Sequence, residues 1–221
     1  MTLEIARNFT QKGIKYIVAL RGDPPESEPC FAPHPEGFKD TCKMIKALKV
    51  VADFNIFVGA YPHKHLKAKN IRHDVEWLKH KFDFGAYETI TQFFFEVDDF
   101  FRFSNTCARA GITTPIVPGI LPVENWQNTK KFAARREAQI PAWMDEIYCK
   151  ASRDERSDLL SIALSTELCS QLIDGRVEAL HFYTFSHLKL TRNICSALGV
   201  IGRTSIERSS KKCLITIKFL F

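Results

Sequence analysis

Two polar side chains lie in or just after apolar, strand-like segments, where they could take part in chemistry. Asp23 follows the segment IKYIVAL (14–20) by three residues, and Gln92 lies within ETITQFFFE (88–96). A carboxylate can stabilise positive charge that develops in a reacting molecule, whereas a primary amide can donate and accept hydrogen bonds at once. The alternatives are a turn or helix-capping aspartate and a buried structural amide. The residue types alone leave both alternatives open.

Basic residues are densest between His63 and Lys81, in the sequence HKHLKAKNIRHDVEWLKHK. Asp74 and Lys81 are seven residues apart, so they lie on one face of a predicted helix. A charge run of this kind is usually a solvated helix face, but it would also suit a polyanionic ligand. The formal net charge of +6 is compatible with nucleic acid or with a smaller anion.

Five strand-like segments recur along the chain and would position these side chains. They are rich in Val, Ile, Phe and Tyr and nearly continuously apolar, as is typical of parallel strands buried on both faces; they span 14–20, 54–62, 88–96, 114–122 and 178–185. Amphipathic stretches predict helices over 38–51, 65–84, 97–111, 125–137 and 154–175. Gly85, Gly111 and Gly175 follow three of these stretches and are predicted to end them.

Strands that alternate with helices predict an α/β fold with a parallel sheet. The sequences GxGxxG, GxxxxGK[ST] and GxSxG are all absent, which disfavours Rossmann, P-loop and α/β-hydrolase chemistry. A TIM (β/α)8-type barrel is therefore favoured, in which the carboxyl ends of the strands form the active face. Such a barrel needs eight strands, so residues 1–200 are interpreted as an incomplete barrel of about five βα units, and residues 201–221 as a C-terminal appendage.

The composition indicates in which cellular compartment and in which state of association we expect the chain. No run of about 18 apolar residues exists to span a membrane, and the first residues lack the apolar core of a signal peptide. Seven scattered cysteines without a CxxC pair favour reduced thiols in a cytoplasm over a disulfide framework or a metal site. We also expect self-association, as a homo-oligomer, because an incomplete barrel leaves strand edges and its inner face uncovered.

Several short sequences together resemble the methylenetetrahydrofolate reductase family. They occur in the family's order and spacing from about residue 3 to residue 200: YIVALRGDPP, VGAYP followed by His65 and Ala68, TITQFFFEV, PGILPV, IPAWM and HFYTF. The resemblance implies a TIM barrel with non-covalent FAD. It further implies transfer of electrons from NADH or NADPH to the flavin, and then to 5,10-methylenetetrahydrofolate to give 5-methyltetrahydrofolate, in one-carbon metabolism and methionine biosynthesis.

The resemblance also implies roles for individual residues. Asp23 would act electrostatically in catalysis, and Asp23, Gln92 and Phe132 would contact the substrates, with Gln92 facing a pterin edge or a nicotinamide carboxamide. The expected FAD contacts are Arg21, Gly22, Asp23, Tyr61, His65, Ala68, Asp74 and Lys81. FAD then replaces nucleic acid as the anionic partner, the other partners are folate and nicotinamide substrates, and neither a metal nor a membrane is implied.

The chain departs from the family's pattern at several of these positions. Trp77 and His80 stand where the family often has asparagine and arginine, and Thr41 and Asn128 stand at further contact positions. His187 replaces the usual arginine that meets folate. Histidine is shorter than arginine and only conditionally charged, so we expect weaker binding of FAD and folate.

The family's catalytic acid, a glutamate at the end of the first barrel strand, has no counterpart here. Glu88 and Glu96 flank the strand that contains Gln92, and neither is an obvious substitute. A positioned general acid contributes about 10²- to 10⁴-fold, so we expect folate reduction to be impaired while oxidation of NAD(P)H remains. The alternative is a non-catalytic, flavin-binding remnant. Another phosphate-binding barrel enzyme would need a glycine-rich loop, which HFYTFSHLK lacks.

Overall fold

The computed structural model describes most of the chain. Its described residues are 2–20, 34–35, 37–65, 68–136, 138–184 and 188–200, together with the backbone of 214–218. Within these ranges the strands are β1 (Tyr16–Ala19), β2 (Asn55–Ala60), β3 (Glu88–Phe93), β4 (Ile116–Ile120), β5 (Ala179–Tyr183) and β6 (Leu214–Lys218). The helices are α1 (Thr2–Gln11), α2 (Thr41–Val51), α3 (Ile71–Asp83), α4 (Val97–Arg109), α5 (Trp126–Arg136), α6 (Ala142–Arg153), α7 (Ser157–Asp174) and α8 (Leu188–Ala197).

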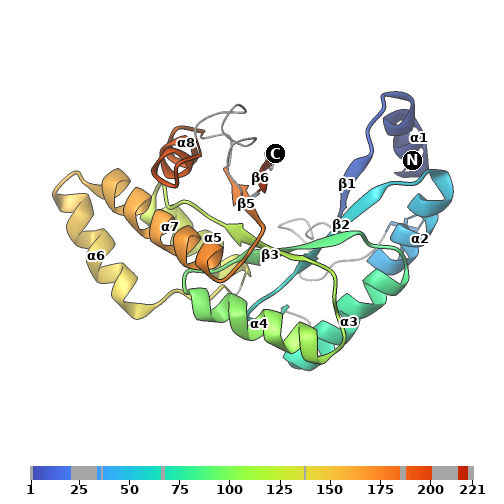
Figure 1. Ribbon diagram of the computed structural model, residues 1–221, viewed down its shortest axis with the longest axis horizontal. Coiled ribbons are helices and arrows are strands. Elements are labelled where there is room, and N and C mark those ends of the chain that lie inside the picture. Colours follow the sequence, from blue (N-terminus) through green and yellow to red (C-terminus); the bar gives the residue numbers. More distant parts are fainter. Residues whose placement is uncertain are drawn as a thin grey trace.

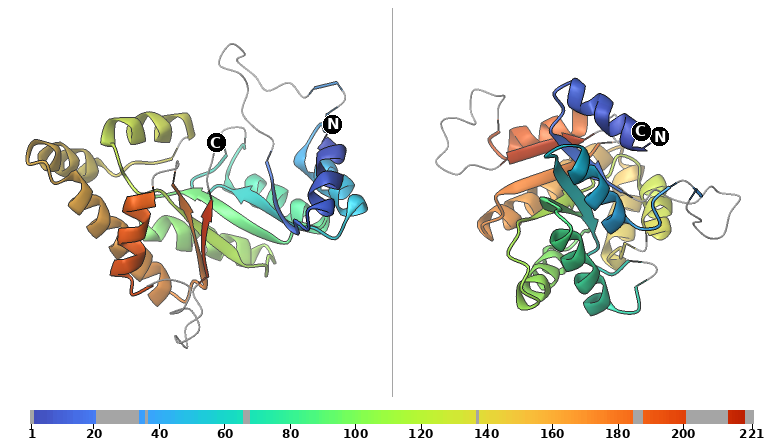
Figure 2. Two further views of the ribbon diagram at one scale, coloured as in Figure 1. Left: turned by 90° about the horizontal axis from the view of Figure 1, so that it is seen from above. Right: turned by 90° about the vertical axis from the view of Figure 1, so that its right-hand side faces the viewer.

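The strands form one sheet in which every neighbouring pair is parallel and the order is β1-β2-β3-β4-β5-β6. The sheet curves as an incomplete barrel, with α2, α3, α4 and α7 along its outer side (Figures 1 and 2). The order does not reverse midway, as it would in a doubly wound sheet. The prediction of an incomplete TIM-type barrel is therefore confirmed.

Capping side chains set the starts of two helices. Asp40 and Asn70 precede α2 and α3, and their side chains accept hydrogen bonds from the backbone N–H groups of Lys43 (2.8 Å) and His73 (2.9 Å). These N–H groups would otherwise lack a partner in the first helical turn. The five predicted helices are confirmed with shifted ends, whereas α1, α6 and α8 lie outside these five stretches.

The three predicted terminal glycines lie at helix ends, but for two different reasons. Gly85 and Gly111 have φ of +104° and +81°, which favours glycine after a helix. Gly175 ends α7 with φ of −74°, and Arg176 takes the left-handed conformation instead. A Cβ at Gly175 would lie 2.2 Å from Cζ of Phe101. Glycine is therefore needed there so that α7 can approach the Phe101 ring.

The main core lies between the sheet and its outer helices. On one side, Ile56 and Val58 of β2 pack with residues of α2 and α3, including Ile45, Leu48, Val75 and Leu78. A second cluster packs β4 and β5 against α7 and α8, through Ile120, Leu180, Phe182, Leu172 and Ile194. Each such side chain contributes about 1.5–3 kcal/mol when buried. This core holds the strands in place and so fixes where their carboxyl ends lie.

The inner face of β1, which points away from the outer helices, is exposed. In β1 the buried residue is Ala19, whereas Tyr16, Val18 and the following Leu20 are 63%, 36% and 52% exposed. Side chains of a strand alternate between faces, so these apolar residues share the inner face. Within the described residues β1 also pairs on one side only. At the other end of the sheet β6 pairs with β5, so β6 rather than β5 is the last strand of the sheet within the described residues.

We predict that this open face drives self-association. Val18→Lys places a charge on the open strand, which disfavours edge pairing, and should shift the protein toward monomer in sedimentation velocity. The matched control is Val50→Lys, because Val50 is 83% exposed on α2, away from the open face, and this change should leave the distribution as it was. A monodisperse monomer before any substitution would contradict the prediction.

Candidate functional site

The carboxyl ends of the parallel strands bring the predicted site residues to one edge of the sheet, as they do in a barrel. Tyr61 and His65 lie in the loop after β2, and Gln92 lies near the end of β3. Arg21, Gly22, Asp23 and His187, which carry several predicted contacts, lie outside the described residues.

The loop after β2 is folded against α3. The Tyr61 and His65 rings meet edge to face with centroids 4.6 Å apart. The His65 backbone N–H donates to Oδ2 of Asp74 (2.7 Å), and the N–H of buried Ala68 donates to the His65 carbonyl (2.9 Å). Four predicted cofactor residues are therefore brought together, and the Asp74 carboxylate fixes the loop that carries the other three.

Lys81 lies on the same face of α3 as Asp74 and is directed toward the sheet. Its Nζ donates to the carbonyl of Gly59 in β2 (2.9 Å). Burial lowers the pKa of Lys81, and the charge of Asp74 acts in the opposite direction. Burial likewise raises the pKa of Asp74, against the hydrogen bond from the His65 N–H. The pair thus places a partly buried cation and a partly buried carboxylate beside the loop.

A close backbone approach shapes the other half of the site. The Gly119 N–H donates to Oγ1 of Thr91 (2.9 Å), and the Tyr183 hydroxyl donates to the Thr91 carbonyl (2.9 Å). A Cβ at Gly119 would lie 2.2 Å from that carbonyl oxygen and 2.6 Å from Cε2 of Tyr183. The β3–β4 register shifts between Ile90 and Phe93. Irregularities of this kind re-aim side chains at barrel rims, and here the shifted segment contains Gln92.

Gln92 and Phe132 border this irregular segment. The Gln92 side-chain oxygen accepts from the Phe93 backbone N–H (3.2 Å). Phe132 of α5 stacks on Phe93 with ring centroids 5.3 Å apart and planes at 18°, and Arg136 lies 5.5 Å over the Phe132 ring. Phe132 remains partly exposed. The sequence prediction missed Thr91 and Tyr183, although the TITQFFFEV and HFYTF segments contain them; burial also raises the pKa of Tyr183.

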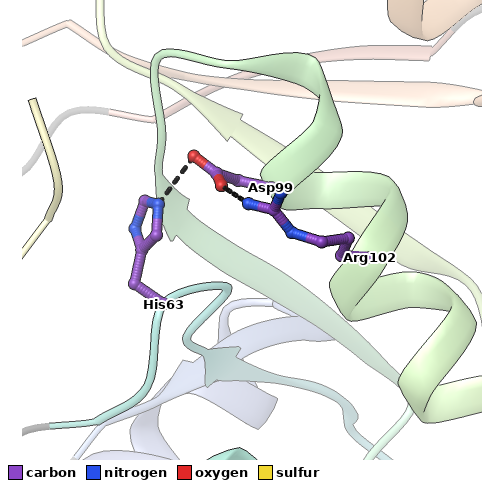
Figure 3. A network of polar contacts seen from close by, with 3 residues as sticks. All are labelled: His63, Asp99 and Arg102. Atoms are coloured by element: carbon purple, nitrogen blue, oxygen red, sulfur yellow. Dashed lines mark hydrogen bonds and ion pairs between the residues drawn. The ribbon is translucent and has the colours of Figure 1, made fainter. Parts of the chain in front are cut away.

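A second group missed from the sequence joins the loop after β2 to α4. His63 Nε2 lies 2.7 Å from Oδ2 of Asp99, and Arg102 contacts the other carboxylate oxygen (Figure 3). His63 and Asp99 are 36 residues apart. No short sequence pattern could have indicated this contact.

The comparisons with known proteins agree with the fold and with the sequence resemblance. The family model described as methylenetetrahydrofolate reductase matches residues 1–199. The chain is 41% identical over 198 residues to the 5,10-methylenetetrahydrofolate reductase of Escherichia coli (strain K12), covering 89% of this chain and 64% of that protein. The relative from Pectobacterium carotovorum subsp. carotovorum, with the same name and the same coverages, is 39% identical. The chain belongs to the methylenetetrahydrofolate reductase family.

The chain spans 64% of the length of these relatives. A solved structure, an uncharacterised protein from Clostridium thermocellum that binds two copies of 5-methyl-5,6,7,8-tetrahydrofolic acid, matches with a TM-score of 0.51 at 15% identity. The match covers 98% of this chain and 62% of that one. At this identity the likeness supports the fold alone.

Two departures from the methylenetetrahydrofolate reductase pattern, Trp77 and His80, fall on the solvent side of α3. Trp77 is 42% exposed, and its ring lies 6.1 Å from that of His80. His80 Nδ1 lies 3.7 Å from Asp83. Thr41 begins α2, and the backbone N–H of Asn128 in α5 donates to the Asn125 side chain. The effect of these changes on binding stays a prediction.

The described residues contain neither a membrane-spanning helix nor a metal-binding cluster. No described helix is both long and apolar enough to cross a membrane. Within the same residues no cluster of three or more His, Cys, Asp or Glu could hold a metal ion. The five described cysteines, 42, 107, 149, 169 and 195, form no disulfide with one another.

We predict that Gly119 cannot carry a side chain. Gly119→Ala forces Cβ against the Thr91 carbonyl and Tyr183, and overpacking of this kind costs about 1–3 kcal/mol. Gly59→Ala in β2 is the matched control, because among the described residues its Cβ would meet Leu20 Cδ2 alone, at an ordinary 3.4 Å, and this change should alter stability by less than about 0.5 kcal/mol. Urea unfolding of both variants measures the difference, and equal midpoints would contradict the assigned close approach.

Proposed function

We propose that the chain performs the FAD-dependent reduction of 5,10-methylenetetrahydrofolate to 5-methyltetrahydrofolate with NAD(P)H. Its membership of the methylenetetrahydrofolate reductase family carries the proposal. The bacterial relatives are named for this reaction, and a rice relative at 32% identity is named a probable methylenetetrahydrofolate reductase (NADH). We further propose a cytoplasmic location with reduced cysteines, and no partnership with nucleic acid or membrane.

The residues beside the β2 loop fit the chemistry of FAD. Lys81 has three N–H donors, of which one is used on Gly59 and the others make no hydrogen bond within the described residues. A partly buried ammonium with unused donors suits a diphosphate, and Asp74 suits ribose hydroxyl groups. Tyr61, His65, Ala68 and the Arg21–Gly22–Asp23 segment are the further proposed contacts.

When bound, FAD would accept a hydride from the nicotinamide and pass it to the folate. The chain's own residues would bind and orient the substrates for these transfers. The Gln92 amide can donate to and accept from a pterin or a nicotinamide carboxamide. Phe132, which is stacked on Phe93, offers an aromatic surface for either planar ring. Asp23 would remain ionised and stabilise the cation that forms when the folate ring opens.

We predict that Lys81 contributes directly to FAD affinity. Lys81→Gln removes the cation and should weaken FAD binding by about tenfold or more, as loss of a charged hydrogen bond does. Lys79→Gln on the same helix is the matched control, since Lys79 also donates to a carbonyl, that of Ala110, but is exposed. Flavin fluorescence titration measures both affinities. Equal losses would indicate a general charge effect, and no loss would remove Lys81 from the site.

We predict that the two half-reactions separate in the 221-residue chain. Glu88 lies at the amino end of β3, whereas Gln92 lies near its carboxyl end. Glu96 is exposed and directly precedes α4. Neither is placed to protonate a folate beside Gln92. The flavin-loaded 221-residue chain should therefore oxidise NAD(P)H with a quinone, which needs no such acid, and reduce methylenetetrahydrofolate about 10²- to 10⁴-fold more slowly than a family member that contains the catalytic glutamate.

Assays of both half-reactions on one flavin-loaded preparation test this prediction. Folate turnover equal to that of an intact family member would mean that another residue supplies the proton. If FAD binds but neither half-reaction occurs, the chain is instead a non-catalytic flavin-binding protein.

A further inference from the structure

The loop between β2 and α3 is attached at two points to two different helices. The His65 N–H is bonded to Asp74 of α3, and the His63 ring is bonded to Asp99 of α4 (Figure 3). Lys64 lies between the two attached residues. The loop that carries Tyr61 and His65 is therefore fixed by side chains that lie outside it.

Lys64 has a backbone conformation that needs such support. Its φ is +117°, and its N–H donates to the Tyr61 carbonyl at 3.2 Å. Residues with a Cβ rarely adopt positive φ, and they keep it only where the surrounding structure holds them there. The hydrogen bonds of His63 and His65 lie directly on each side of this residue, so they are well placed to hold it.

The His63–Asp99 contact is buried and well anchored. The His63 and Asp99 side chains are 9% and 5% exposed. Asp99 lies in the first turn of α4, where the helix dipole stabilises a carboxylate. Arg102, whose side chain is 71% exposed, contacts the other oxygen of Asp99 from the same helix. The carboxylate is thereby fixed in place before it meets His63.

We propose that His63 and Asp99 form a positioning pair that holds the 61–65 loop in its FAD-binding conformation. This inference rests on the proposed function, since FAD is the ligand that the loop would bind. Neither residue needs to touch the cofactor. The pair acts through the loop backbone, because breaking it lets Lys64 leave its positive φ and lets the Tyr61 and His65 rings separate from their edge-to-face contact.

The test compares three variants with the unmodified chain. His63→Ala removes the bond to Asp99. His63→Gln keeps an N–H donor of similar reach and is the rescue variant. Arg102→Ala removes the exposed partner of Asp99 but leaves His63 in place, so it is the control. Two quantities are measured: the rate of trypsin cleavage at the Lys64–His65 bond without FAD, followed by mass spectrometry, and FAD affinity by fluorescence titration.

We expect His63→Ala to raise cleavage at Lys64 and to weaken FAD binding, each by about tenfold to a hundredfold, as loss of a hydrogen bond to a charged group does. His63→Gln should restore most of both values, and Arg102→Ala should leave them nearly unchanged. Unaltered cleavage at Lys64 in His63→Ala would overturn the proposal. So would a rise at every trypsin site together with a lower urea midpoint, because that pattern indicates a general loss of stability.

The two proposals fail in distinguishable ways. If the unmodified chain binds no FAD, the proposed function is overturned together with the cofactor part of this inference, while the cleavage rates still decide whether the pair holds the loop. If the unmodified chain binds FAD and His63→Ala binds it equally well, only the positioning role is overturned.

Discussion

Parallel pairing of neighbouring strands in chain order is the constraint on which the other features depend. Parallel strands need a crossover connection between them, and these connections place the helices along the outer side of the sheet. Ile56 and Val58 are buried under those helices, whereas Tyr16 and Val18 on the opposite face stay accessible. The same arrangement directs all the carboxyl ends to one edge, so Tyr61, Gln92 and Tyr183 come near a common rim although they are far apart in the sequence.

The two halves of this rim are built by different means. At β2 the polar loop is held by side chains from α3 and α4, through Asp74 and Asp99. At β3 to β5 the backbone itself sets the shape, because Gly119 lets the Thr91 carbonyl and the Tyr183 ring approach closely. The first half suits an anionic, hydroxylated cofactor and the second a planar ring. This division corresponds to the separate cofactor and substrate contacts that we propose.

The sequence allowed the basic segment from 63 to 81 to be either a solvated helix face or a site for an anion, and the structure is compatible with both. Lys79 and His80 lie toward solvent, where Lys79 contacts Ala110 and His80 faces Asp83. Lys81 points toward the sheet and bonds to Gly59. Burial lowers the pKa of Lys81, and an anion bound beside it would offset this effect by favouring the charged form. One helix therefore combines a solvated face with a candidate anion site.

The sequence by itself determined the fold class, the parallel pairing of the strands and the approximate extents of five helices, because each depends on local patterns: continuous apolar runs, amphipathic stretches, and terminal glycines such as Gly85 and Gly111. It also determined the family, through short segments in a fixed order. Only the tertiary structure decided that Gly175 makes room for Phe101 and that Gly119 makes room for Thr91 and Tyr183. Only the tertiary structure also decided that His63 contacts Asp99, which is 36 residues away in the sequence. These contacts depend on which strand and helix lie side by side, and the spacing of residues within one segment carries no information about a neighbour from another.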